Sequence, residues 1–178
     1  MNTLDALAAA VPVIRTERLT LRAPRMADFD LFADFFASPR SHMDEGPKTR
    51  PEAWDLFAKG AGQWLLRGYG QWNVDDAAGN LVARVGLYHP ITWPEPELAW
   101  MVLDPAAEGR GIAYEAANAA RAAAARIWGI TRPISSIFPE NTRSIRLAER
   151  LGAMHEGDRE TIYGVMQTWR HSAPEGAR

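Results

Sequence analysis

A glycine-containing turn between a predicted strand and a predicted helix is the clearest candidate for chemistry. It reads Glu108-Gly109-Arg110-Gly111-Ile112-Ala113. Backbone N–H groups at such a turn attract anions together with the helix N-terminus, and glycines let a phosphate approach without obstruction by a Cβ atom. The spacing lacks the Gly-Lys-Ser/Thr of a P-loop and the third glycine of a dinucleotide-binding turn. The turn is therefore predicted to bind the phosphates of another ligand, with a tight turn that binds nothing as the alternative.

The composition limits the remaining chemistry. The chain has 178 residues, 20 Lys plus Arg against 22 Asp plus Glu, and no Cys. Without Cys, thiolate zinc sites, Cys nucleophiles and CxxC redox motifs are excluded. His42, His155 and His171 show no metal-ligand spacing, so we interpret them as surface residues and predict no metal site. The near-neutral charge argues against a general binder of nucleic acid or anionic membranes.

The length favours one domain over residues 1–178, with a surface or dimer-contacting lead-in at 1–13 and a polar tail at 172–178. No stretch approaches the roughly 18 uncharged apolar residues of a membrane-spanning helix. The apolar run from Leu4 to Val13 includes Asp5 and follows no basic residue, which argues against a secretory signal. We expect a cytoplasmic protein.

The elements that must position the turn follow from hydrophobic periodicity. The pattern predicts an α+β fold with a mostly antiparallel sheet, because the hairpin from Tyr69 to Tyr88 contradicts the parallel units of a flavodoxin-like nucleotide binder. One stripe of the long Ala-rich helix is expected to face the sheet: Ile112, Ala116, Ala119, Ala123 and Ile127. The predicted strands are 18–22, 71–74, 81–88, 97–103, 134–138 and a pair within 154–169. The predicted helices begin after Asp28, which is expected to cap the first, just before Pro51, after Gly111 and after Asn141, and Gly129 is expected to end the third.

Three segments resemble the GNAT family of N-acetyltransferases. The turn at 108–113 is similar to that family's (Gln/Arg)-x-x-Gly-x-(Gly/Ala) loop for the acetyl-CoA pyrophosphate. Residues 141–153 are similar to its Asn-capped helix ending in Leu-Gly-Phe, and residues 15–22 to the start of its ribosomal-protein N-terminal acetyltransferase branch. The resemblance covers nearly the whole chain. It implies a single GNAT-like domain whose central sheet, with helices on both faces, splays at the acetyl-CoA site.

The resemblance also implies acetyl-CoA as co-substrate and assigns its contacts. The strand from Glu97 to Leu103 would splay at a bulge to admit the pantetheine arm, and an N–H near Met101 would polarise the thioester carbonyl. Asn141 would contact the pantetheine. The backbone partners of the arm would be Met101, Val102 and Leu103, and those of the pyrophosphate Gly109, Arg110, Gly111, Ile112 and Ala113.

Two positions depart from the family pattern. Glu108 stands where relatives carry Gln or Arg, and we expect its side chain to turn to Arg110 or to solvent while the backbone binds phosphate. Ala148 stands where many relatives carry a Tyr that protonates the leaving thiolate. The resemblance leaves Ser144 as the group that holds the thiolate, with a hydroxyl bonded to the helix backbone as the alternative.

The base is open between several candidates. The resemblance favours Glu97, which is otherwise a water-facing residue at a hairpin edge, and His89 on the adjacent loop is the second candidate and a substrate-binding one. Water alone could also serve, because an α-amino group with a pKa of about 7.7–8.0 is roughly one-tenth neutral at pH 7. Trp93 in the same loop is expected to line the acceptor side and to offer an apolar or cation–π wall to the amine, with a ring folded back on the hairpin as the alternative.

These features predict an N-acetyltransferase that moves the acetyl group of acetyl-CoA to a primary amine by direct attack, without a covalent enzyme intermediate because Cys is absent. A non-catalytic acyl-CoA-binding or sensing domain is the alternative. Protein N-termini, antibiotic amines, polyamines and free amino acids all remain open as acceptors. A homodimer is possible.

Overall fold

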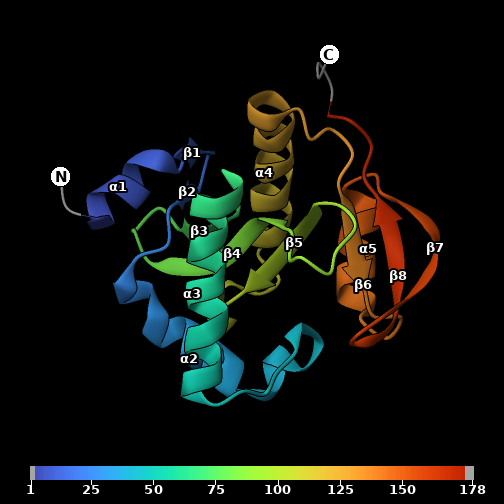
Figure 1. The fold of residues 1–178 in the computed structure, drawn as a ribbon, viewed down its shortest axis with the longest axis horizontal. Helices are drawn as coiled ribbons and strands as arrows, with labels where there is room; N and C mark the ends of the chain where they lie inside the picture. The colour runs from blue at the N-terminus through green and yellow to red at the C-terminus, as the bar shows by residue number, and fades with distance from the viewer. Residues whose placement is uncertain (1–2, 175–178) are drawn as a thin grey trace.

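The computed structural model describes residues 3–174, which form an eight-stranded sheet with helices on both faces (Figure 1). The strand order is β1-β2-β3-β4-β5-β6-β8-β7, and only β5 and β6 pair in parallel among these strands. The strands are β1 (Ile14–Arg15), β2 (Thr20–Arg22), β3 (Gln71–Asp75), β4 (Leu81–Tyr88), β5 (Glu97–Val102), β6 (Ile134–Ile137), β7 (Met154–Thr161) and β8 (Gly164–Arg170). The helices are α1 (Thr3–Ala10), α2 (Phe29–Ala37), α3 (Arg50–Arg67), α4 (Ile112–Trp128) and α5 (Thr142–Arg150), with 3-10 turns at Met26–Asp28, Pro39–Asp44 and Pro105–Ala107.

The two faces of the sheet bury different side chains. Figure 1 shows α3 crossing in front of the strands and α4 behind them. Along β4, Val85 packs in the core formed with α4, whereas Arg84 and Tyr88 line a cavity on the α2 and α3 side. Side chains of a strand alternate between its faces, so the polar positions of β4 share one side.

The long helix α4 packs through alanine side chains. Gly129, with a φ of 67°, ends it as expected. The predicted stripe is partly wrong, because Ile127 is 41% exposed, whereas Ala117, Ala120 and Ala124 are buried. Ala116 and Ala123 are buried as predicted. The alanine-rich sequence offers several stripes of equal character, so periodicity alone did not fix the rotation of the helix.

The N-terminal segment is part of the fold. Residues 3–10 form α1, and Ile14 of β1 pairs with Leu21 of β2. Val11 is 2% exposed, and the Trp72 indole N–H donates to the Pro12 carbonyl at 2.7 Å. Val11 and Pro12 of the expected lead-in are therefore packed against the sheet, whereas Ala8, Ala9 and Ala10 are exposed, as expected of a surface segment. The predicted first strand begins at Thr20 rather than at residue 18.

Two further expectations need correction. His171 is fully buried rather than a surface residue: its N–H donates to the Pro133 carbonyl at 3.0 Å, and its Nε2 lies 2.9 Å from the Ser135 hydroxyl. Asp28 makes no side-chain cap for α2, because its carboxylate pairs with buried Arg22. His42 and His155 are exposed as predicted. Residues 175–178 of the predicted polar tail lie outside the described residues.

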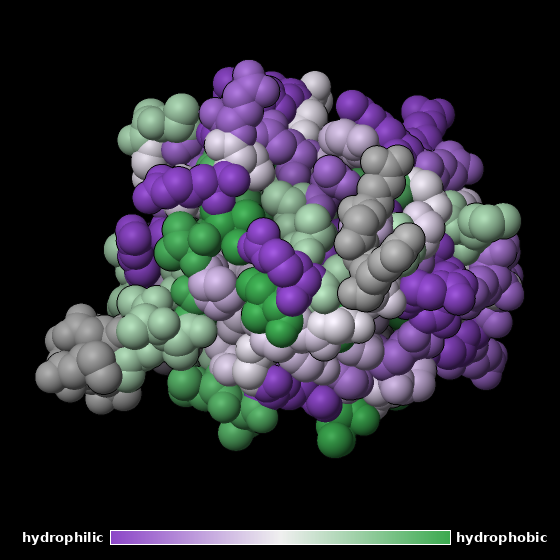
Figure 2. Space-filling view, turned by 90° about the horizontal axis from the view of Figure 1, so that it is seen from above, coloured by the Kyte–Doolittle hydropathy of each residue, from purple (hydrophilic) through white to green (hydrophobic). Residues whose placement is uncertain are grey.

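Figure 2 shows the face seen from above in Figure 1, where hydrophobic side chains form small groups separated by polar ones. Within residues 3–174, no helix is long and apolar enough to cross a membrane.

Candidate active site

The sheet opens along one edge of β5. On one side β5 pairs with β4 from Glu97 to Val102, but on the other side it pairs with β6 only at Glu97. The predicted bulge is absent, since the register between β4 and β5 is continuous. The opening arises because β6 diverges beyond Ser135, whose hydroxyl donates to the Leu98 carbonyl at 2.6 Å. A hollow of about 60 Å³ lies in the gap.

The register decides which backbone groups face this open edge. The Leu103 N–H donates to the Val82 carbonyl of β4 at 2.9 Å. In an antiparallel pair, successive residues point their N–H groups alternately to one neighbour and to the other. The N–H of Met101 therefore faces β4, and those of Trp100 and Val102 face the opening. These two are the N–H groups near Met101 that a ligand at the open edge can reach.

A cavity of about 430 Å³ lies between this edge and the start of α4, and we call it the glycine-loop cavity. Gly109 and Gly111 have φ angles of 72° and 77°, a left-handed conformation that glycine adopts without strain. The first N–H to bond back to the turn is that of Glu115, which donates to the Gly111 carbonyl at 3.1 Å. The N–H groups of residues 112–114 are therefore free of helical partners. The lining of the glycine-loop cavity includes Val102, Gly109, Gly111, Ile112, Ala113, Asn141, Arg143, Ser144, Arg146 and Arg150.

This lining fits a diphosphate. Unpartnered N–H groups at a helix N-terminus attract anions, and Arg143, Arg146 and Arg150 add positive charge. A Cβ atom at Gly111 would meet only Arg18 Nη2, at 3.6 Å, so the positive φ rather than a lack of space favours glycine at this position. Arg110 is exposed and is not among the residues that line this cavity.

The expected orientation of Glu108 is wrong. Its carboxylate pairs with Arg40 at 2.6 Å and with Arg143 at 2.9 Å, and the first of these contacts lowers its pKa most. The Arg40 guanidinium also donates to the carbonyls of Val102 and Leu103 at 2.8 and 2.7 Å. Arg40 comes from the turn at 39–44, far from Glu108 in sequence, so local reasoning did not find it. The carboxylate beside the glycine turn is neutralised by two arginines.

Leu103 contributes little to this edge. Its side chain is 1% exposed and packs with the phenylalanines of α2. Its N–H bonds β4 and its carbonyl bonds Arg40. Met101 and Val102 line the glycine-loop cavity, whereas Leu103 does not.

Asn141 and Ser144 stand at the start of α5. The Asn141 side chain accepts from the Ser144 N–H at 3.2 Å and caps the helix, as the sequence indicates. The Ser144 hydroxyl accepts from the Trp100 indole N–H at 3.2 Å, so its own proton is directed elsewhere. The alternative of a hydroxyl bonded to the backbone is not what the structure has.

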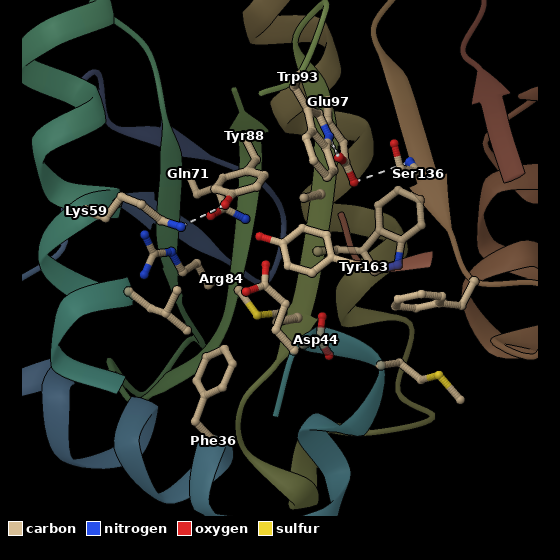
Figure 3. Close-up of a pocket in the computed structure, with 18 of the residues that line it drawn as sticks. Phe36, Asp44, Lys59, Gln71, Arg84, Tyr88, Trp93, Glu97, Ser136 and Tyr163 are labelled. Carbon is tan, nitrogen blue, oxygen red and sulfur yellow. Dashed lines mark hydrogen bonds between the residues drawn. The ribbon is translucent and has the colours of Figure 1, made fainter. Parts of the chain in front are cut away.

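A second cavity of about 140 Å³ lies on the α2 and α3 side of β5, and we call it the aromatic cavity (Figure 3). Met43, Asp44, Trp100 and Met101 line both cavities, so the two meet at the open part of β5. Rings and charged groups share its wall: Phe32, Phe36, Tyr88, Trp93, Phe138 and Tyr163 with Asp44, Glu45, Lys59, Arg84 and Glu97.

Glu97 is buried in the wall of the aromatic cavity. Its carboxylate accepts from the Trp93 indole N–H and, at 3.3 Å, from the Ser136 N–H. Burial raises the pKa of Glu97 to about 7, although both hydrogen bonds act in the opposite direction. The interpretation as a water-facing hairpin residue is therefore wrong. A carboxylate that is half protonated near neutral pH suits proton transfer.

Trp93 lines the aromatic cavity and also packs against neighbouring rings. It is 7% exposed. Its ring packs edge-on against Tyr88 and Tyr163, with centroids 6.3 and 5.9 Å away, and the Arg159 guanidinium lies 5.3 Å from its centroid. Arg159 therefore already occupies the cation–π position that we expected an acceptor to use.

His89 lies apart from both cavities. Its Nδ1 is 2.6 Å from the Tyr69 hydroxyl, and the two rings stack. Desolvation and nearby Arg67 lower its pKa. Neither cavity includes His89 in its lining.

Sequence reasoning missed several residues of the aromatic cavity. Asp44 has a pKa raised to about 7 by burial and by neighbouring Glu45. Arg84 is 2% exposed, and burial lowers its pKa to about 10. The alternation of β4 would have placed Arg84 and Tyr88 on one face, but Asp44 lies in an irregular segment that carries no such signal. In the part of the chain that the structure describes, no group of three or more His, Asp or Glu side chains could hold a metal ion.

A sheet that opens at one strand, with a turn that fits an anion on one side and a buried carboxylate on the other, fits a CoA-dependent acetyltransferase. Residues 18–154 match the acetyltransferase (GNAT) domain, and the chain belongs to this family. An acetyltransferase from Agrobacterium tumefaciens str. C58 is 36% identical, with a TM-score of 0.82 over 90% of this chain and 94% of that one.

Two further solved structures share the fold. A putative GNAT-family acetyltransferase from Bordetella pertussis is 28% identical, with a TM-score of 0.77 over 90% of this chain and 99% of that chain. RimL, a ribosomal L7/L12 alpha-N-protein acetyltransferase in complex with coenzyme A, is 15% identical, with a TM-score of 0.75 over 91% and 98%.

Proposed function

We propose that this acetyltransferase transfers the acetyl group of acetyl-CoA to a primary amine in the aromatic cavity, by direct attack of the amine on the thioester. The observation that carries the proposal is the meeting of the two cavities at Trp100 and Met101, beside the open edge of β5. An amine on one side of this edge can reach a thioester on the other. The complex of the fold neighbour RimL with coenzyme A is consistent with this assignment.

The glycine-loop cavity would hold the co-substrate. The amides of Gly109, Gly111, Ile112 and Ala113 would bind the pyrophosphate, with Arg110 contributing only its backbone. Asn141 would contact the pantetheine arm, and the N–H groups of Trp100 and Val102 offer it hydrogen bonds at the open edge of β5. An N–H aimed at the thioester oxygen stabilises the charge that develops there, and it does so more in the transition state than in the ground state.

On the acceptor side, Glu97 would act as the base. The amine nitrogen forms a bond to the thioester carbon, and its surplus proton passes to the Glu97 carboxylate directly or through water. The C–S bond then breaks, and the thiolate leaves while the Ser144 hydroxyl donates a hydrogen bond to the sulfur. Trp100 supports this role because its indole N–H already occupies a lone pair of the Ser144 oxygen. Glu97 is preferred to His89 as the base because Glu97 lines the aromatic cavity, whereas His89 lines neither cavity.

Release of CoA from acetyl-CoA in the presence of a panel of amines tests the proposal. The chain has no Cys, so a thiol reagent reports only released CoA. Binding of acetyl-CoA is measured separately by calorimetry. Amine-dependent release that is lost in Glu97→Gln supports the proposal. Tight binding of acetyl-CoA without release by any amine would support the acyl-CoA-sensing alternative.

We also retain three expectations from the sequence: one domain over 1–178, a cytoplasmic location and a possible homodimer. Light scattering on purified protein measures the mass of the assembly and tests the last of these.

A further inference from the structure

Arg84 is a buried cation without a hydrogen-bonding partner. It is 2% exposed, and within residues 3–174 no acceptor bonds its Nε or Nη1 atoms. The guanidinium lies over the rings of Phe32 and Phe57, at 5.1 and 5.9 Å from their centroids. Aromatic faces stabilise a cation, but they do not replace the hydrogen bonds that five N–H donors require. A buried guanidinium is normally paired with an anion.

The nearby carboxylates do not supply that anion. The negative charge of Asp28 raises the pKa of Arg84, so Asp28 is the nearest candidate. Its oxygens already accept other hydrogen bonds, however: Oδ1 accepts from Arg22, and Oδ2 accepts from Arg22, Arg25 and Asn73. Asp75 also pairs with Arg22. These two acids are therefore engaged elsewhere, and among the described residues no hydrogen bond or ion pair joins Arg84 to Asp44, Glu45 or Glu97, which line the same cavity. Nε and Nη1 are buried within the protein, but the Arg84 side chain lines the aromatic cavity, so a ligand seated there would lie against it.

The two basic side chains of the aromatic cavity lie on one side of it, and Glu97 lies on the other (Figure 3). Figure 3 shows Arg84 and Lys59 on its α3 side, with Trp93 and Glu97 across from them. Lys59 Nζ lies 3.0 Å from the Tyr88 hydroxyl, so a second cation stands at this end. In the register of the sheet, Arg84 is opposite Met101 and Tyr88 is opposite Glu97. Measured along the strands, the backbone positions of Arg84 and Glu97 are therefore about 13 Å apart. Both residues line the aromatic cavity, whose volume is about 140 Å³.

We propose that the acceptor of this enzyme is a small amine that carries a carboxylate in the same molecule, such as a free amino acid, and that Arg84 binds the carboxylate. This inference rests on the proposed acetyl transfer. Binding of the carboxylate at the α3 end directs the amine toward Glu97 and the open edge of β5. Asp44 and Glu45, which also line the cavity, repel a carboxylate placed the other way round. Arg84 is thus a specificity residue, remote from the reacting atoms.

The test uses matched pairs of acceptors. Apolar L-amino acids and ω-amino acids of increasing length are each compared with their carboxamides, which replace the carboxylate by a neutral group of nearly the same size. The wild-type enzyme is expected to prefer the acid. Arg84→Met is expected to lower kcat/KM for the best acid by at least about tenfold, because it removes a charge-assisted hydrogen bond, and to leave the carboxamide unchanged.

A second variant moves the guanidinium without removing it. A methyl group at Gly60 would overlap the Arg84 Nη2 atom, so Gly60→Ala is expected to raise KM for the acid with acetyl-CoA affinity unchanged. Gly62→Ala on the same helix, where a Cβ atom meets nothing within 4 Å, is the matched control. Gly60→Ala also carries the test if Arg84→Met does not fold.

Each result bears on one proposal. Equal activity of acid and carboxamide in the wild type, or an equal loss for both in Arg84→Met, overturns the carboxylate assignment. Acetyl-CoA binding without acetylation of any pair overturns it too and directs the search to other amines. Failure to bind acetyl-CoA overturns the proposed function instead.

Discussion

The two cavities that meet at β5 are built in opposite ways. The glycine-loop cavity draws many of its groups from two continuous segments, 107–114 and 141–150, and much of what it offers is backbone. The aromatic cavity is lined by side chains from α2, α3, β3, β4, β5, β6 and β8 and from the turn at 39–44. Backbone recognition of a phosphate needs only a local conformation, whereas recognition of an acceptor needs side chains that the whole fold must bring together.

Their electrostatics differ as well. Four arginines line the glycine-loop cavity, and Glu108, the acid beside its glycine turn, is paired with two of them. In the aromatic cavity, burial raises the pKa values of Glu97 and Asp44 to about 7. The glycine-loop cavity would thus bind the fixed negative charge of a ligand, and the aromatic cavity would exchange a proton near neutral pH. Variants on each side should therefore fail in different ways.

The largest effect is expected on the aromatic side. Glu97→Gln should lower kcat by about 100-fold or more, because it removes the base, while the Kd for acetyl-CoA stays at the wild-type value. The wild-type kcat/KM should rise with pH through about 7 as Glu97 loses its proton. This limb should be absent from the variant.

Glu95→Gln is the matched control, since Glu95 lies two residues earlier, in the loop before β5, but pairs with Arg170. A Glu97→Gln enzyme with normal kcat would mean that water alone accepts the proton.

The same carboxylate should affect stability, with a sign that is fixed by its pKa. The folded-state pKa of Glu97, about 7, exceeds its usual 4.5, so the folded protein binds the proton more tightly than the unfolded chain. The free energy of unfolding should therefore decrease as pH rises from about 4.5 to 7. Asp44 acts in the same direction. Urea unfolding at pH 5 and pH 8 should show Glu97→Gln gaining stability relative to the wild type at the higher pH, and no such gain would argue against a raised pKa.

The next effect is expected on the glycine-loop side. Gly111→Val should weaken acetyl-CoA binding by about tenfold or more, equivalent to about 1.4 kcal/mol, because a Cβ atom and a changed φ disturb the amides that would meet the pyrophosphate. Calorimetry measures the affinity. Gly79→Val is the control, since Gly79 has a similar φ of 85° in the hairpin turn and open space around it. Unchanged affinity in a folded Gly111→Val protein would refute the phosphate assignment.

The contrast also explains what the sequence could predict. The positive φ angles of Gly109 and Gly111 and the side-chain cap of Asn141 are local features, which short motifs report directly. Arg40 reaches Glu108 across 68 positions. No periodicity reports such a contact, and the orientation of Glu108 was accordingly mispredicted. The splay of β5 followed from the family resemblance, but its cause, the divergence of β6 rather than a bulge, depends on long-range pairing.

A smaller effect is expected where the two sides meet. Ser144→Ala should lower kcat by up to about tenfold, because the developing thiolate would lose the hydrogen bond from the Ser144 hydroxyl. The Kd for acetyl-CoA should change little, since that bond strengthens only as charge grows on sulfur. Steady-state kinetics and calorimetry separate the two quantities. A loss confined to binding would make Ser144 a positioning residue.

The smallest effect is expected from Trp93→Phe, which keeps a ring against Tyr88 and Tyr163 but removes the indole N–H that donates to Glu97. That bond stabilises the carboxylate, so its loss should raise the pKa of Glu97 further and move the acidic limb of kcat/KM to higher pH by up to about one unit. Well above pH 8 the rate should match the wild type. Trp93→Ala removes the ring packing as well and should lower the melting temperature. Comparison of the two variants therefore separates the packing contribution of Trp93 from that of its hydrogen bond to Glu97. Trp54→Phe, on exposed Trp54 of α3, should leave the limb in place. If Trp93→Phe also leaves it in place, the limb reports a group other than Glu97, and Asp44, the other cavity carboxylate with a pKa raised to about 7, becomes the base to test.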